Sequence, residues 1–133
     1  MTTLKSLDAY LENANTSKSF NVIFQFDKEM DRLSVEDRFN WKMSRASGSG
    51  PGEAYNFGFP TASTEISFSS FPDNVYYDAD SLTAKVQFTL KQNETADGTI
   101  DPSHVEFKFS GEDKWGLSMD KDNDQFTGFS GVF

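Results

Sequence analysis

The residues best suited to chemistry are three aspartates in a short acidic turn near the end of the chain. Asp120, Asp122 and Asp124 alternate with a lysine and an asparagine, and side chains in this pattern can direct hard oxygen ligands at a Ca²⁺ ion. The first five positions resemble the start of an EF-hand loop, but the sixth is Gln125 instead of Gly and the twelfth is Gly131 instead of Glu. A true EF-hand is therefore excluded.

Two interpretations of the acidic turn stay open. The first, which we favour, is a solvated turn with no bound metal and no cofactor anywhere in the protein. The second is a looser Ca²⁺ site between the loops of a β-sandwich. Carboxylates from other turns, either those of Asp78 and Asp80 or that of Asp113, would add ligands if the fold brought these turns together.

Aromatic rings are the second kind of candidate site. Tyr55, Tyr76 or Tyr77, and Trp115 are candidates for an aromatic platform that binds carbohydrate. The rings of Tyr and Trp suit this task because each also carries a polar group. However, the chain has 14 Phe against 4 Tyr and 2 Trp. This excess of phenylalanine favours a buried core over a sugar platform.

Catalytic groups are scarce in the sequence. There is no cysteine, and His104 is the only histidine. A cysteine nucleophile is thus excluded, and a Ser-His-Asp triad would have to use His104. The segment 48–52 (GSGPG) lacks the lysine and the following helix of a phosphate-binding loop. We therefore predict that the protein is not an enzyme.

Length and charge restrict the class of protein. The 133 residues fit one domain, and the net charge of −9 disfavours nucleic acids and anionic membranes as partners. No apolar run approaches the roughly 18 residues of a membrane span, and no secretory leader is recognisable. We expect a cytoplasmic protein if Met1 is the native start, and an extracellular or cell-surface location if the chain is part of a larger protein.

The first 18 residues are expected to form a helical lead-in to a β domain that covers residues 19–133. Leucines at positions 4, 7 and 11 and an alanine at 14 have helical spacing, which predicts a helix over 2–13. After it, apolar and polar residues alternate with a period of two in many short runs, which predicts strands. These runs are 20–27, 39–44, 55–59, 64–71, 75–77, 82–91, 105–109, 115–119 and 126–133.

Three finer expectations follow from the same periodicity. Met30, Leu33 and Val35 should tuck under the edge of the core, although their segment breaks the alternation. Phe39 should point inward, in line with the other aromatic residues of its run. Because neighbouring strand residues point to opposite faces, only one ring of the 76–77 tyrosine pair can lie in the core.

The stretch VIFQFDKEMDRLSVEDRFNW resembles the opening of bacterial immunoglobulin-like domains of the S-layer type. The matching residues are Phe26, Met30, Asp31, Ser34, Val35 and Phe39. The resemblance is carried mainly by residues 19–43, and it implies a β-sandwich used as a spacer or display unit in surface proteins. The loop over 45–58 is longer than such modules usually carry.

Periodicity and resemblance together predict an all-β protein, an immunoglobulin-like antiparallel β-sandwich of seven or eight strands with a short N-terminal helix. We expect a non-enzymatic structural or display module of a bacterial surface or filament protein, whose partners are other proteins or other domains of a larger assembly. The alternative is a carbohydrate-binding module assisted by Ca²⁺ or built on an aromatic platform.

Overall fold

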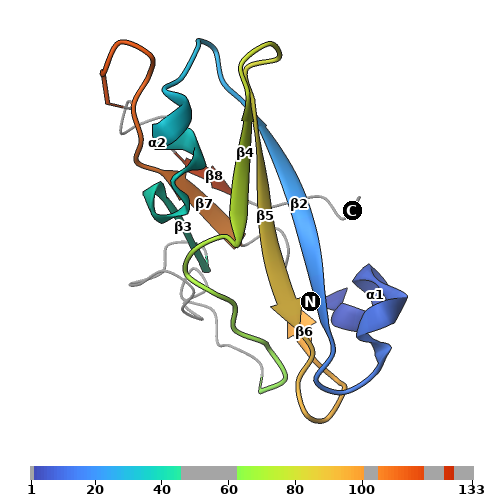
Figure 1. The fold of residues 1–133 in the computed structure, drawn as a ribbon. Coiled ribbons are helices and arrows are strands. Elements are labelled where there is room, and N and C mark those ends of the chain that lie inside the picture. Colours follow the sequence, from blue (N-terminus) through green and yellow to red (C-terminus); the bar gives the residue numbers. More distant parts are fainter. Residues whose placement is uncertain (1, 46–62, 101–104, 119–124, 128–133) are drawn as a thin grey trace.

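The computed structural model describes residues 2–45, 63–100, 105–118 and 125–127 (Figure 1). These residues form antiparallel sheets with few and short helices, which confirms the predicted all-β class. One three-stranded sheet has the order β2-β5-β4, another has the order β3-β7-β8, and β1 pairs with β6. The strands are β1 (Thr2–Thr3), β2 (Ser17–Gln25), β3 (Trp41–Arg45), β4 (Asn74–Asp78), β5 (Thr83–Lys91), β6 (Thr99–Ile100), β7 (Val105–Phe109) and β8 (Gln125–Thr127).

The long pair β2–β5 follows directly from the alternation in the sequence. The two strands pair in register from Ser17 opposite Lys91 to Gln25 opposite Thr83. Large apolar residues of both strands, such as Phe20 and Phe88, are buried, while their neighbours in sequence face outward. Because a shift of one residue would turn this whole apolar row to solvent, the pattern itself fixes the register.

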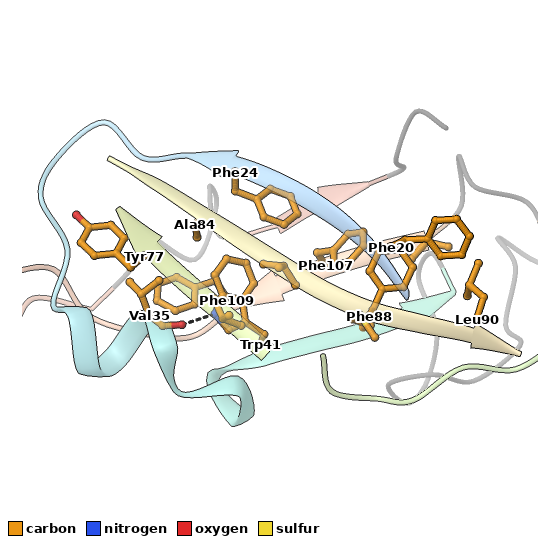
Figure 2. Packing of buried hydrophobic residues seen from close by; sticks show 14 of the residues in the cluster. Phe20, Phe24, Val35, Trp41, Tyr77, Ala84, Phe88, Leu90, Phe107 and Phe109 are labelled. Carbon is orange, nitrogen blue, oxygen red and sulfur yellow. Dashed lines mark hydrogen bonds between the residues drawn. The ribbon is translucent and has the colours of Figure 1, made fainter. Parts of the chain in front are cut away.

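Aromatic rings fill the space between the two three-stranded sheets (Figure 2). The ring of Phe24 on β2 lies 5.4 Å from that of Trp41 on β3 and 5.3 Å from that of Phe107 on β7, measured between centroids. The rings of Trp41 and Phe109 are 4.6 Å apart, and Phe88 on β5 also meets Phe107 at 5.7 Å. Burying each large apolar side chain stabilises the fold by roughly 1.5–3 kcal/mol, so this cluster is the main source of stability.

The predicted N-terminal helix is broken into two pieces. Helix α1 (Leu4–Leu7) and the 3₁₀-helix η1 (Ala9–Glu12) are separated by Asp8, whose backbone is extended. The Asp8 carboxylate accepts a hydrogen bond of 2.8 Å from the backbone N–H of Tyr10, which caps η1. The first and third leucines of the expected stripe are fully buried in the common core, whereas Ala14 is exposed.

Two expectations for the segment after β2 were wrong. Residues 32–36 form helix α2 (Arg32–Glu36), which turns Leu33 outward with 81 % of its surface exposed, while Met30 and Val35 are buried as predicted. Phe39 is also exposed, because it lies in the 3₁₀-helix η2 (Arg38–Asn40) and not in the following strand. The carboxylate of Asp37 accepts from the N–H of Phe39 at 3.1 Å and starts this turn, an effect that apolar periodicity does not record.

Two further predicted strands also differ from the structure. Residues 114–116 form a turn, and Trp115 and Leu117 are both exposed. In 64–71 the structure shows only an isolated bridge, from Glu65 to Thr99, although Ile66 is buried as expected. The run 55–59 lies outside the described residues, as does most of 126–133.

Helix α2 covers the sheet β2-β5-β4 at its edge strand β4. The Glu36 carboxylate accepts the backbone N–H of Tyr77 at 3.0 Å, and Arg32 Nη1 donates to the carbonyl of Tyr77 at 2.8 Å. These bonds occupy backbone groups that an edge strand would otherwise offer to another chain. An ion pair of 3.3 Å joins Arg32 and Glu36 to each other.

Within the part of the chain that the structure describes, no helix is both long enough and apolar enough to cross a bilayer.

Candidate functional site

Outside the core, one loop is folded around a single buried carboxylate. We call residues 111–118, which follow β7, the Asp113 loop. Asp113 is only 1 % exposed, and its Oδ1 accepts hydrogen bonds of 2.9 Å from the backbone N–H groups of both Trp115 and Leu117. Its own N–H donates to the carbonyl of Leu117 at 2.9 Å. Gly116 closes the turn with a φ of 78°, in the left-handed region that favours glycine.

A lysine from another part of the chain neutralises this carboxylate. Lys28 Nζ lies 2.6 Å from Asp113 Oδ2. The hydrogen bond from Lys28, followed by those from the N–H groups of Leu117 and Trp115, holds the pKa of Asp113 below its usual value. The same bond raises the pKa of Lys28. Both groups are therefore charged at neutral pH, and the pair joins segments 85 positions apart.

Backbone contacts tie the Asp113 loop to the segment between β2 and α2. Met30 and Asp113 form a β-bridge, and on either side of it Lys114 donates its N–H to the carbonyl of Glu29 and Asp31 donates to that of Glu112. The side chains of Lys114 and Glu29 add an ion pair at 3.0 Å. The loop is thus held by backbone pairing in addition to its central carboxylate.

Ser34 and Gly111 fix the start of the loop. The hydroxyl of Ser34 on α2 accepts the N–H of Glu112 at 2.7 Å. A Cβ atom at Gly111 would collide with the ring of Phe109 and with the Ser34 hydroxyl. Glycine is therefore needed at this position because helix and loop approach each other closely.

The Asp113 loop displays apolar side chains. Trp115 is 67 % exposed and Leu117 is 63 % exposed, although the backbone N–H groups of both residues are hydrogen-bonded to the Asp113 carboxylate. Figure 1 shows the loop, in orange, beside α2 at one end of the molecule. A fixed backbone with exposed Trp and Leu side chains can bind another surface without losing much conformational entropy.

The predicted calcium residues are not gathered into a site by the described part of the chain. Asp120, Asp122 and Asp124 lie outside the described residues. The carboxylate of Asp113 forms an ion pair with Lys28, and Asp78 Oδ1 accepts a hydrogen bond of 3.0 Å from the backbone N–H of Asp80. Hydrogen bonds from Ser81 and Asp80 lower the pKa of Asp78. No group of three His, Cys, Asp or Glu residues suited to a metal occurs among the residues described.

The predicted sugar-platform residues differ in their exposure to solvent. Tyr76 is 54 % exposed on the outer face of β4, whereas Tyr77 is buried, so the expectation that one ring of this pair faces outward is confirmed. Tyr77 cannot serve as a platform, because its hydroxyl accepts the N–H of Met30 at 2.8 Å inside the protein. Trp115 is exposed on the Asp113 loop, while Tyr55 and His104 lie outside the described residues.

The pairing of Lys28 with Asp113 was missed by sequence reasoning. The sequence suggests Asp113 only as an additional calcium ligand and gives no partner for Lys28. The local sequence GEDKWG does signal a turn through its two glycines. However, no sequence spacing indicates which of the 12 Lys and Arg residues would meet the carboxylate.

The chain was also compared with known proteins. No family model, curated protein or solved structure matches it.

Proposed function

We propose that this protein is a non-enzymatic structural or display module, an immunoglobulin-like sandwich within a bacterial surface or filament protein. Its mechanism would be mechanical: a stiff fold spaces its neighbours and presents loops to them. Its partners would be other proteins or other domains of the same assembly, and neither nucleic acid nor a membrane is part of this proposal.

The observation that carries the proposal is the construction of the Asp113 loop. An ion pair between the buried Asp113 carboxylate and the partly exposed Lys28, together with a set of backbone bonds, holds this loop in place, yet Trp115 and Leu117 project into solvent. The aromatic core between the two three-stranded sheets supports the mechanical half of the proposal. Interlocked rings of this kind resist partial opening, because sliding one sheet would expose several rings at once.

Stretching the protein between two handles tests this proposal. A spacer module should extend in a single cooperative event, releasing roughly 3.3–3.6 Å for each residue that unfolds. The Trp115→Ser variant is the matched control, since this exposed side chain should not change the unfolding force. Gradual extension at low force, with no cooperative event, would contradict a mechanical role.

The alternative is a carbohydrate-binding module assisted by Ca²⁺ or built on an aromatic platform. The exposure of Tyr76 and Trp115 favours it. Thermal unfolding with excess Ca²⁺ and with a chelator separates the display module from the calcium-assisted form of this alternative. The display module predicts equal melting temperatures. Under the alternative, Ca²⁺ at about 100 times its dissociation constant would add roughly 2.7 kcal/mol of stability, and the Asp122→Ala variant would abolish this gain.

A further inference from the structure

The outer face of the sheet β2-β5-β4, which points away from the core, carries two organised rows of side chains. The pairing of the strands places Ile23, Lys85 and Tyr76 directly opposite one another in one row. Two residues further along, Asn21, Gln87 and Asn74 form a second row in the same way. Neighbouring strands lie roughly 4.8 Å apart and residues two apart along a strand lie about 7 Å apart, so the two rows form one continuous patch.

The second row consists of amides alone. The Asn74 side-chain nitrogen donates to Gln87 Oε1 at 3.1 Å, which leaves the Gln87 Nε2 and Asn74 Oδ1 atoms as a donor and an acceptor. Asn21 adds a third amide, and its residue is exposed. Amides that offer both donors and acceptors match sugar hydroxyls, which also donate and accept.

The first row supplies the apolar part of the patch. The ring of Tyr76 is more than half exposed, and Ile23 stands at the other end of its row with 67 % exposure. Lys85 lies between them and is exposed as well. An aromatic face beside uncharged polar groups is the usual composition of a surface that stacks on the C–H face of a sugar ring.

The charge of this face differs from that of the whole protein. The chain carries 21 Asp and Glu against 12 Lys and Arg, yet the outward residues of these three strands include Lys85 and Lys91 with Asp78 as the single carboxylate. Asp73, which directly precedes β4, adds a second carboxylate by accepting a hydrogen bond from the Thr89 hydroxyl on β5, so two lysines and two carboxylates balance on this face. The net charge of −9 would still disfavour a polyanion. An uncharged ligand with many hydroxyl groups fits both facts.

We propose that the outer face of β2-β5-β4 binds a neutral linear polysaccharide, with a sugar ring stacked on Tyr76 and hydroxyl groups bonded to the amides of Asn21, Gln87 and Asn74. This inference develops the aromatic-platform form of the alternative proposed above, adds to the display role, and uses none of the residues of the Asp113 loop. A protein partner fits the patch less well, because the centre of a protein interface is usually richer in large apolar side chains than this face.

Electrophoresis of the whole chain through gels containing a soluble glycan tests the inference. The probes are hydroxyethylcellulose, galactomannan and glycol chitin, each neutral, together with polygalacturonate as a polyanion. We expect at least one neutral glycan to slow the protein equally at low and high salt. Tyr76→Ala should weaken binding roughly tenfold, Tyr76→Phe should retain it, and Gln87→Ala should cause a smaller loss.

Two variants serve as controls. Tyr10→Ala removes another exposed tyrosine, on η1, and Trp115→Ala removes the exposed ring of the Asp113 loop; neither should change the retardation. Three results would overturn the inference: no retardation by any of the neutral glycans, retardation by polygalacturonate alone that disappears at high salt, or retardation that survives Tyr76→Ala and is lost in Trp115→Ala. The stretching experiment reports on the display role separately, so the two proposals can fail independently.

Discussion

Replacing Trp41 by alanine is expected to lower the free energy of unfolding by about 3–5 kcal/mol, the range for a large aromatic side chain removed from a core. Trp41 is almost fully buried and its ring meets those of Phe24 and Phe109. Its indole Nε1 also donates to the carbonyl of Val35 at 2.8 Å, as Figure 2 shows. Chemical denaturation measures the change, and the melting temperature should fall by roughly 10 °C or more.

The second tryptophan provides a matched control for this experiment. Trp115→Ala removes the same side chain from an exposed position, so stability should stay within about 0.5 kcal/mol of the original protein. Trp41→Phe should lie between the two, because it keeps a ring and loses the bond to Val35. Similar losses from Trp41→Ala and Trp115→Ala would contradict the division between core and displayed side chain.

Replacing Asp113 by alanine is expected to release the Asp113 loop while the sheets remain folded. The variant leaves the N–H groups of Trp115 and Leu117 without their shared acceptor and Lys28 without its partner. Lys114 sits inside the loop, so trypsin reports on its opening. We expect cleavage after Lys114 to become at least about tenfold faster, since proteolysis follows the population of the locally open state.

The control for the Asp113→Ala variant is a substitution at the neighbouring residue of the same loop. Glu112→Ala removes an exposed carboxylate while leaving the backbone bond from Glu112 to Ser34 in place, so cleavage after Lys114 should not change. Equal rates for the original chain and for Asp113→Ala would mean that the carboxylate does not hold the loop.

The Lys28–Asp113 pair also predicts how stability depends on pH. The pKa of Asp113 is lowered from 3.8 in the folded protein, so its contribution is present above that value and is lost as the pH falls through the folded pKa. The pKa of Lys28 is raised above 10.5, so its contribution is present below that value and is lost as the pH rises further. Asp113→Asn should therefore weaken the acid-side fall in stability.

The sequence predicted the parts of the fold that one-sided burial determines. Alternation along 20–27 and 82–91 was sufficient to place β2 and β5, because a strand with one buried face has a single register that hides its apolar residues. The same logic correctly assigned one ring of the tyrosine pair on β4 to solvent. These are local patterns with one dominant cause, the burial of apolar surface.

The missed features depend on polar groups and on distant partners. The carboxylates of Asp8 and Asp37 redirect the chain through side-chain bonds to nearby backbone N–H groups, so an apolar stripe alone misjudged the helix and Phe39. Trp115 and Leu117 have strand-like spacing, yet the Asp113 carboxylate folds their backbone into a turn. Its partner, Lys28, is distant in sequence, and only the three-dimensional fold brings the two together.

Hydrogen exchange of the backbone amides of Trp115 and Leu117 tests most directly whether the protein presents exposed side chains on a fixed loop. Both N–H groups donate to the buried Asp113 carboxylate, so they should exchange at least about tenfold more slowly than unprotected amides, although their side chains are exposed. The protection should disappear in Asp113→Ala. Exchange at the unprotected rate in the unaltered protein would contradict the fixed loop and the display role built on it.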